Sequence, residues 1–414
     1  MIVRRTVLRA VSTFTAAGLV LLAAGAAEAA ATSGSTTEPG RAAVKPPASV
    51  VATTFQADAG HTGYVVGGVA RPPLQRRWVR TLPGSVSYPL LAEGKVVVTA
   101  ALPGGRSGTA LHVLDARTGR DVRPPVGLGG RHWWSASAYG DGRVYVVNDR
   151  GLMRAYTLRT GKLLWRRQLP GQYAFDSAPT FAAGTVYTGG AGGGGTLYAV
   201  DARTGRVRWT RTVANGGGSA PAVTSTGVYV AYSCGQAYRF HPETGREMWH
   251  HDEGCNGAGG NTPVITKGGL WVRDDGTTRE RFFDLATGRV RTSAPTKRLH
   301  QSTAAFAGRA GFVVRDGRLH AVTTSSPWRS RWTFTGDGDL VTSPLVVDSV
   351  VYIASTTGRL TAVDTTSGRT VWSTGLGGTL TPIDEDSTAQ PLPGLAAGQG
   401  RLVVPVGRRL VAFG

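Results

Sequence analysis

One short phrase recurs along this chain at a nearly constant spacing. Its two complete copies run from Ala199 to Trp209 and from Ala362 to Trp372, and both read Ala-Val-Asp-x-x-Thr/Ser-Gly-x-x-x-Trp. Successive turn glycines of the phrase are 42, 44, 40 and 43 residues apart, and then 80 residues apart across one degenerate copy. A period of about 40 residues predicts a repeat architecture, because each unit buries its apolar face only against its neighbours.

Each repeat unit reads as four β-strands. A Ser-x-Pro step such as Ser177-Ala-Pro179 leads into a stretch such as Gly184-Thr-Val-Tyr187, in which apolar and polar side chains alternate. Period-two alternation bounded by glycine turns is typical of strands, and the mature chain has no stretch with a helical period. Four antiparallel strands repeated about every 42 residues predict an all-β chain that folds as a β-propeller of four-stranded antiparallel blades.

The number of blades follows from the slot that the tryptophan occupies. The phrase begins again at Leu410, but the chain stops at Gly414, where the next outer strand would start. A matching strand lies near the other end, at residues 74–82, so we expect an eight-bladed propeller whose last blade is closed by an N-terminal strand. Seven blades is the alternative, if the degenerate unit around Pro327 is not a blade. The eight slots are Trp78, Arg123, Trp165, Trp209, Trp249, Thr292, Trp332 and Trp372.

The recurring residues of the phrase have structural roles. Glycine permits the positive φ of a tight hairpin, and aspartate accepts hydrogen bonds from the turn amides. The tryptophan offers a flat ring to the next blade, which buries about 150–250 Å². We therefore expect structural docking by Trp78, Trp165, Trp209, Trp249, Trp332 and Trp372, and by Asp115, Asp201, Asp284 and Asp364.

The N-terminal residues read as an export signal followed by a tether. Arginines at positions 4, 5 and 9 precede an apolar run over 16–27, and small residues follow it. We expect a signal peptide over residues 1–31, a disordered linker over 32–52 and the propeller over 53–414. The apolar run is short for a membrane span, so the mature chain is expected to have no transmembrane segment. The prediction is a secreted or cell-envelope-associated protein, exported by the general secretory or the twin-arginine route.

The chain is strongly basic, with a net charge of +20 that arginine dominates. A balance of this size is found in proteins that bind nucleic acid or anionic surfaces. The arginines are spread along the repeats, often at the same turn position, as on a solvated surface. The distribution therefore favours a chain that binds no nucleic acid, with a specific polyanion site as the alternative.

The recurring phrase resembles the tryptophan-docking motif of the pyrroloquinoline-quinone-like (PQQ-like) propeller repeat, over about residues 53–414. Members of that family include quinoprotein alcohol dehydrogenases, the propeller lipoprotein of outer-membrane protein assembly and extracellular sensor propellers of some bacterial kinases. The segment from Phe55 to Tyr64 is similar to the lead-in of non-enzymatic members. In enzymatic members, the resemblance implies, the cofactor lies beneath a ring formed by two adjacent cysteines, and this chain has no such pair. PQQ and calcium are therefore expected only if the chain is a dehydrogenase.

The two cysteines are expected to oxidise in an exported chain. Cys234 lies in a predicted turn and Cys255 in a predicted loop, and a four-stranded meander brings both to one face. A disulfide between them would close a loop of about 20 residues and add about 3 kcal/mol. Free thiols or a redox pair are the alternative, and zinc is less favoured because only two thiols are present, without Cys-x-x-Cys spacing.

The same face collects the loops that lead into each inner strand, and these loops carry aromatic rings beside amides and carboxylates. Such a mixture is typical of a pocket for a sugar, a peptide or a quinone. The alternative is that each ring fills its own gap between blades and each polar residue caps a turn. No sequence motif marks a metal site or a catalytic residue. The candidate ligand-binding residues are His132, Trp133, Trp134, Tyr173, Phe175, Asp176, Asn256, Asn261, His300, Gln301 and Asp337.

The sequence thus predicts a monomeric, secreted, non-catalytic propeller that binds or scaffolds an envelope protein or glycan. Propeller loops suit recognition because they vary on a rigid frame. Two alternatives are a quinone-dependent oxidoreductase of the alcohol or sugar dehydrogenase type, and a polysaccharide-active enzyme with carboxylates at the funnel.

Overall fold

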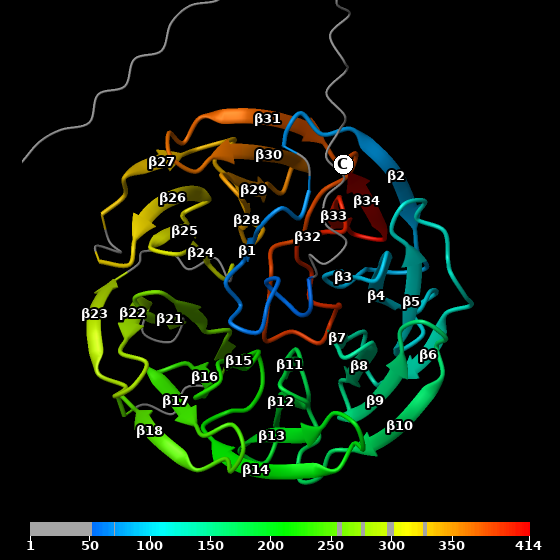
Figure 1. Cartoon of the computed structure of the whole chain (residues 1–414), viewed down its shortest axis with the longest axis vertical. Helices are drawn as coiled ribbons and strands as arrows, with labels where there is room; N and C mark the ends of the chain where they lie inside the picture. Colours follow the sequence, from blue (N-terminus) through cyan, green and yellow to red (C-terminus); the bar gives the residue numbers. More distant parts are fainter. Residues whose placement is uncertain (1–51, 70, 255–258, 275–277, 296–301, 326–328) are drawn as a thin grey trace, which may run out of the picture. The chain divides into compact units, whose positions relative to one another are not determined.

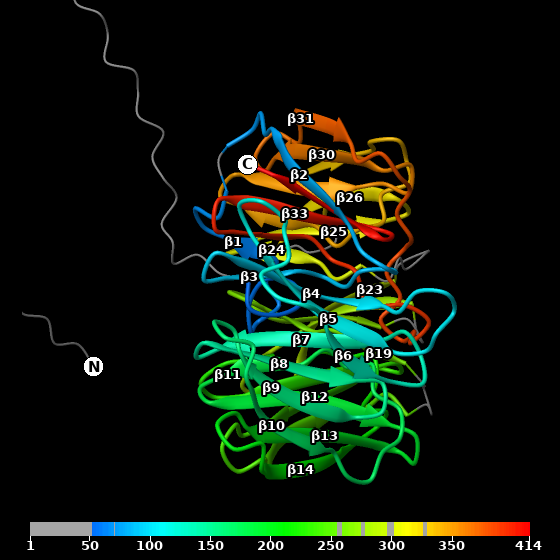
Figure 2. The same ribbon diagram turned by 90° about the vertical axis from the view of Figure 1, so that its right-hand side faces the viewer.

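The computed structural model describes residues 52–69, 71–254, 259–274, 278–295, 302–325 and 329–414, which belong to one compact unit. Within these ranges every regular element is a strand, and no helix is present that is long and apolar enough to cross a membrane. The strands form eight antiparallel meanders of four strands each, arranged around a common centre (Figure 1). In each meander the strands run across the thickness of the ring (Figure 2). The predicted all-β propeller is confirmed.

The first four blades follow chain order, and each blade's first strand lies innermost. Blade 1 contains β3 (Leu90–Ala92), β4 (Lys95–Ala101), β5 (Thr109–Asp115) and β6 (Val126–Gly129). Blade 2 contains β7 (Ser135–Gly140), β8 (Arg143–Asn148), β9 (Leu152–Thr157) and β10 (Leu163–Gln168). Blade 3 contains β11 (Thr180–Ala182), β12 (Thr185–Ala191), β13 (Gly195–Asp201) and β14 (Val207–Val213). Blade 4 contains β15 (Ala222–Val223), β16 (Val228–Tyr232), β17 (Gln236–Phe240) and β18 (Glu247–His251), and β19 (Gly260–Asn261) also pairs with β16.

The remaining blades repeat the pattern. Blade 5 contains β20 (Val264–Thr266), β21 (Gly269–Asp274), β22 (Arg279–Phe283) and β23 (Val290–Pro295). Blade 6 contains β24 (Ala305–Ala307), β25 (Ala310–Arg315), β26 (Arg318–Thr323) and β27 (Trp332–Phe334). Blade 7 contains β28 (Leu345–Val347), β29 (Val350–Ala354), β30 (Arg359–Asp364) and β31 (Thr370–Gly375), with β1 (Tyr64–Val65) parallel to β28. Blade 8 contains β32 (Ala396–Gly398), β33 (Arg401–Val406), β34 (Arg409–Phe413) and β2 (Arg76–Thr81).

Blade 8 is built from both ends of the described chain. Strand β2 pairs antiparallel with β34, with Trp78 opposite Ala412 and Thr81 opposite Arg409. The predicted closure by an N-terminal strand is therefore confirmed. The degenerate unit forms a complete blade 6, so the seven-blade alternative is wrong. Because β2 pairs with β34, the last blade has four strands like the others, and β34 is not left as an unpaired edge.

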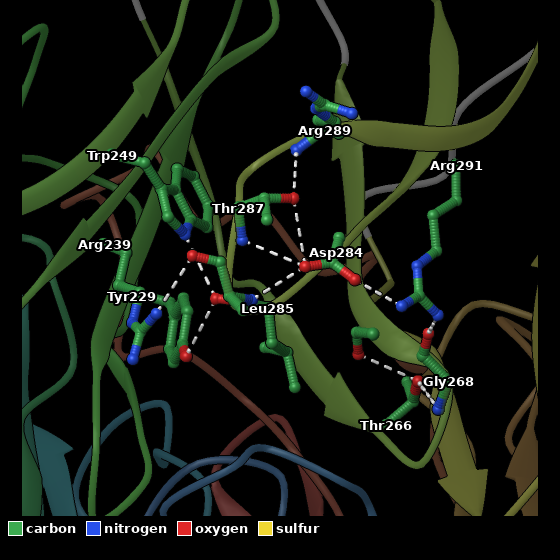
Figure 3. A network of polar contacts seen from close by, with 12 residues as sticks. Tyr229, Arg239, Trp249, Thr266, Gly268, Asp284, Leu285, Thr287, Arg289 and Arg291 are labelled. Carbon is green, nitrogen blue, oxygen red and sulfur yellow. Dashed lines mark hydrogen bonds and ion pairs between the residues drawn. The ribbon is translucent and has the colours of Figure 1, made fainter.

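Residues of the recurring phrase form the contact between neighbouring blades, as blades 4 and 5 illustrate (Figure 3). The indole Nε1 of Trp249 donates a hydrogen bond to the backbone oxygen of Leu285 at 3.1 Å. Asp284 Oδ1 accepts hydrogen bonds from the amide and the hydroxyl of Thr287, at 2.9 and 3.0 Å. A Cβ added to Gly288, which has a φ of 69°, would lie 2.6 Å from the ring of Trp249. The turn therefore needs glycine both for its φ and for the ring that covers it.

The Ser-x-Pro step joins the blades close to the ring centre. Ser177 Oγ donates to the backbone oxygen of Ser219 at 2.7 Å, and Ser219 Oγ donates to that of Asn261 at 3.0 Å. Each of these two hydroxyls also accepts from an amide of its own blade, Gly189 N at 2.9 Å and Ala231 N at 3.2 Å. One buried hydroxyl thus links two blades at positions one repeat apart, which explains why the step recurs in the sequence.

The two ends of the ring carry different connections. In each meander, the turns between the first and second strands and between the third and fourth strands lie at the same end, which we call the turn face. The connections between the second and third strands, and those between consecutive blades, lie at the opposite end, which we call the loop face. Ligand-binding residues of a propeller would lie on one of these faces or at the centre.

Candidate functional site

Residues 52–68 cross the centre of the ring beside the inner strands (Figure 1). Their backbone oxygens accept hydrogen bonds from amides at the ends of inner strands, as Thr53 does from Tyr139 at 2.7 Å and Ala59 from Val223 at 2.7 Å. Because these amides lie at the turn-face ends of the inner strands, the segment covers the centre on that face. Further pairs of this kind are Ala52 with Leu91, Gly60 with Ile265, Thr62 with Phe306, Gly63 with Val346, Val65 with Asp348 and Gly68 with Gly400.

His61 holds this segment in place from within. The ring is fully buried, with Nδ1 2.8 Å from the backbone oxygen of Phe55 and Nε2 3.1 Å from that of Pro221. Burial lowers the pKa of His61 below its ordinary value, while the contacts with the backbone oxygens of Phe55 and Pro221 act in the opposite direction. The histidine is therefore a structural crosslink between the segment and blade 4.

The long loop between β31 and β32 (residues 376–395) closes the centre at the loop face. Its backbone oxygens at Leu392 and Thr388 accept hydrogen bonds from Tyr88 N at 2.7 Å and Trp133 N at 3.2 Å. Leu392 and Ile383 are buried in the same apolar cluster as Phe55 and Tyr88, whose ring centroids lie 5.5 Å apart. The β31–β32 loop and the N-terminal segment thus meet in one core at the centre of the ring.

Two adjacent acids attach the β31–β32 loop to β19 and to the segments that lead into blades 5 and 6. Glu385, which is buried, accepts from Thr262 N at 2.9 Å and from Thr303 Oγ1 at 2.7 Å. Asp386 Oδ1 accepts from Gly260 N at 2.7 Å. Burial raises the pKa of Glu385. Desolvation and the neighbouring acids raise the pKa of Asp386 to about 7.

Asp176 completes this acidic group from blade 3. Its Oδ1 accepts from Gly218 N at 2.9 Å, and burial raises its pKa. Gly218 lies against the opposite carboxylate as well, since a Cβ there would collide with Asp386 Oδ1. The described residues contain no group of three or more acids, histidines and cysteines arranged to hold a metal ion. Each carboxylate is instead bound to amides or hydroxyls of the chain.

Four of the predicted ligand-binding residues lie on the surface of the loop face. Tyr173 is 69 % exposed and donates from its hydroxyl to the backbone oxygen of Gly192 at 2.6 Å. Trp133 is half-buried, and its Nε1 donates to the backbone oxygen of Arg106 at 3.0 Å. His132 is exposed in the loop between blades 1 and 2, and Asp337 is exposed in the loop between blades 6 and 7. Trp133 and Tyr173 therefore offer aromatic surface that a partner can contact.

Other predicted residues are turned into the fold. Trp134 and Phe175 are buried in the apolar cluster that also contains Tyr88, and Phe175 fills the space beside Gly151 and Gly190. Asn261 is buried, and its Oδ1 accepts from Arg273 Nη2 at 3.1 Å. The structure does not bring these three side chains to a surface. Cys255, Asn256, His300 and Gln301 lie outside the described residues, so their roles and the disulfide stay predictions.

The loop beside Cys234 is held by a buried ionic group that the sequence analysis missed. The amides of Cys234 and Gly235 donate to Asp274, at 3.0 and 2.7 Å. Arg281 Nη1 donates to the same carboxylate at 2.7 Å, and Arg281 Nε donates to Glu253 at 3.0 Å. The signal was the charged residues of blade 5, since Arg273 and Asp274 in β21 and Glu280 and Arg281 in β22 are all buried.

Among the described residues, the cavity at the centre of the ring is too small for a quinone cofactor. A flat three-ring molecule needs a pocket of several hundred Å³, roughly 300 Å³ or more. The cavity beside the β31–β32 loop, between Leu380, Ile383 and Pro393, has a volume of about 10 Å³. Larger hollows of about 450 and 330 Å³ lie on the outer rim, beside Arg167 and Thr333 respectively, and are open to solvent.

Eight blades joined by tryptophan and Asp-x-x-Thr/Ser-Gly turns define a PQQ-like β-propeller. The chain matches the family model described as outer membrane protein assembly factor BamB, over residues 113–193, 174–326 and 281–413. The chain belongs to this family.

Curated relatives match parts of the chain. BamB of Yersinia pestis is 24% identical over 243 residues, covering 56% of this chain and 54% of that protein. The dehydrogenase subunit of the quinone alcohol dehydrogenase of Gluconobacter oxydans is 30% identical over 148 residues, covering 30% of this chain and 19% of that protein. The chain thus spans about half the length of the Yersinia relative and less of the Gluconobacter one.

Solved structures share the fold at low sequence identity. The quinohemoprotein alcohol dehydrogenase of Comamonas testosteroni superposes with a TM-score of 0.68 at 15% identity, covering 89% of this chain and 81% of that one. BamB of Moraxella catarrhalis superposes with a TM-score of 0.61 at 15% identity, covering 82% and 99%. These likenesses concern the fold alone.

Proposed function

We propose that this chain is a non-catalytic propeller of the bacterial cell envelope, which binds an envelope protein or glycan through its loop face. One observation carries the proposal: the centre of the ring is filled by the chain's own residues 52–68 and 376–395. A propeller filled in this way offers a rigid platform rather than a deep pocket. The half-buried ring of Trp133 and the exposed ring of Tyr173 are the contact points that we assign to the partner.

Membership of the BamB family supports this proposal, because the matched relatives are named as assembly factors of the outer membrane. The quinone-dependent oxidoreductase remains the competing function, supported by the Gluconobacter relative over less than a third of this chain. The filled centre and the bound state of Asp176, Glu385 and Asp386 argue against it.

Affinity capture from envelope extracts tests the proposed function. Tagged wild-type chain, the Trp133→Ala variant and the Tyr173→Ala variant would be compared by quantitative mass spectrometry. We expect a captured species that both loop-face variants reduce at least tenfold. The control is Val79→Ala, which removes exposed apolar surface from β2 on the outer rim and should leave the capture unchanged.

Activity assays on the same preparation test the alternatives. Reduction of an artificial electron acceptor with PQQ, calcium and an alcohol or sugar would contradict the non-catalytic proposal. Release of soluble sugar from envelope glycans would support the polysaccharide-active alternative and would also contradict the non-catalytic proposal. A capture that Val79→Ala diminishes as much as Trp133→Ala does would show that the loop face is not the binding surface.

A further inference from the structure

The turn face of blades 1 to 3 presents a continuous row of cations. In each of these blades, the turn between the third and fourth strands has one basic residue directly before its Thr-Gly pair and one directly after it. All six side chains are exposed, and the spacing of the blades places one pair beside the next. The six residues, which we call the basic arc, are Arg117, Arg120, Arg159, Lys162, Arg203 and Arg206.

The acids of the same turns are engaged within the fold. Asp115 Oδ1 accepts from Thr118 N and Thr118 Oγ1, both at 2.8 Å. Asp201 caps its turn in the same manner and pairs with Arg208 Nη2 at 2.6 Å. In blade 2 the corresponding position is Thr157, so that turn contains no acid. The inner turns add Glu93, which accepts from Tyr139 OH at 2.8 Å, and the exposed Asp141. These carboxylates keep their charge, and Asp121 of the blade 1 turn pairs with Arg80, so the six cations still outnumber the acids of these turns: Asp115, Asp121, Asp201, Glu93 and Asp141.

Exposed apolar side chains lie in the same turns or at the turn-face ends of the outer strands that follow them. Among the described residues, nine large hydrophobic side chains are exposed, and six of them follow a turn glycine by two or three positions. In blades 1 and 2 these are Val122, Leu163 and Leu164, directly beside the basic arc. A seventh, Val66, is 61 % exposed on the N-terminal segment that covers this face.

We propose that the turn face docks on an anionic lipid bilayer through the basic arc. Arginine matches the phosphate of a lipid headgroup, and several cations in one plane match a planar anionic surface. Apolar side chains beside the cations contact the boundary between headgroups and acyl chains, as in proteins that lie on a membrane. A soluble polyanion would gain nothing from Val66 or Leu163, so the combination favours lipid over an anionic polymer. The docked propeller would leave its loop face directed away from the bilayer.

Vesicle sedimentation with the full chain tests this proposal. The probes are vesicles of phosphatidylcholine alone and vesicles that also contain phosphatidylglycerol. We expect binding to the anionic vesicles only, weakened by added salt. Neutralising the six residues of the basic arc to Gln should raise the lipid concentration for half-binding at least tenfold. The matched control neutralises six exposed arginines of the loop face, and should change that concentration less than twofold: Arg106, Arg131, Arg150, Arg318, Arg359 and Arg408.

A second variant separates lipid from other polyanions without changing the charge. Val66→Ser, Leu163→Ser and Leu164→Ser together should weaken vesicle binding at least threefold and leave binding of soluble polyphosphate unchanged. Equal losses in the arc and control variants would overturn the proposal, since net charge alone would then explain binding. The absence of vesicle binding, or vesicle binding that the serine variant retains in full, would also overturn it. Thermal unfolding of each variant confirms that the ring is intact.

Discussion

At the residue scale, the glycine of each turn serves two purposes that one pair of substitutions can separate. Gly205 and Gly184 belong to the same blade and have φ values of 73° and 72°. A Cβ on Gly205 would lie 2.6 Å from the ring of Trp165, whereas a Cβ on Gly184 would meet nothing within 4 Å. Gly184→Ala should therefore lower the free energy of unfolding by about 1–2 kcal/mol, the cost of the left-handed backbone.

Gly205→Ala should cost about 1–3 kcal/mol more than Gly184→Ala, because the indole of Trp165 must also move. Chemical denaturation of both variants at one temperature measures the difference. Equal destabilisation would contradict the view that the tryptophan packs on the turn glycine of the next blade.

The repeat allowed most of these single positions to be predicted, because one role recurs at a fixed spacing. The slot at Arg123 shows where the pattern falls short: the guanidinium donates to the backbone oxygen of Leu158 at 3.1 Å, in the place of an indole. The chain keeps the hydrogen bond across blades and gives up the aromatic ring, which a search for tryptophan cannot detect.

At the element scale, the β31–β32 loop closes the centre of the ring and carries an acid, Asp386, whose pKa is raised by folding. The pKa of Asp386 lies near 7 in the folded chain, above its ordinary value of 3.8. A carboxyl whose pKa is raised by folding stabilises the folded state at pH values below its pKa in the unfolded chain. This contribution is lost as the pH rises through about 7. Asp386→Asn keeps an acceptor for Gly260 N and removes the titration.

We expect Asp386→Asn and the wild type to be equally stable near pH 4. Above about pH 8 the variant should be more stable by about 1 kcal/mol, a modest value because part of Asp386 is exposed to solvent. Urea denaturation of both proteins across this pH range measures the difference between their free energies of unfolding. His61 is present in both proteins, so its own pH dependence, which has the opposite sign, cancels in that difference. Asp316→Asn, at an exposed acid of the same face, is the control. A stability difference that stays constant with pH would contradict the assignment.

Strands and irregular segments differed in how far the sequence could predict them. Alternation and glycine turns specify the strands locally, so each blade was recognisable. Residues 52–68 and 376–395 have no periodicity, and their positions depend on partners more than 100 residues away, such as Thr262 for Glu385. Burial of Phe175, Trp134 and Asn261 depends on the same distant packing. Sequence alone therefore could not separate surface from core among the loop residues.

At the scale of the whole molecule, the two faces have separate proposed roles. The loop face carries Trp133 and Tyr173 for an envelope partner, and the turn face carries the basic arc for an anionic bilayer. Substitutions on one face should leave the function of the other intact, because the ring between them is rigid. Trp133→Ala should reduce capture without affecting vesicle binding, and the basic-arc variant should retain capture from detergent extracts.

Both proposals depend on a ring that is closed by the pairing of β2 with β34, and a cysteine crosslink tests that pairing directly. Thr81 and Arg409 are opposite each other in the register, at the spacing a disulfide can bridge. Mild oxidation of Thr81→Cys/Arg409→Cys should yield an intramolecular 81–409 crosslink in the monomer, identified by peptide mass spectrometry. The control Thr81→Cys/Arg359→Cys, with its second thiol in blade 7, should yield none. An 81–409 pair that stays reduced, or that links only between chains, would contradict the closed eight-bladed ring.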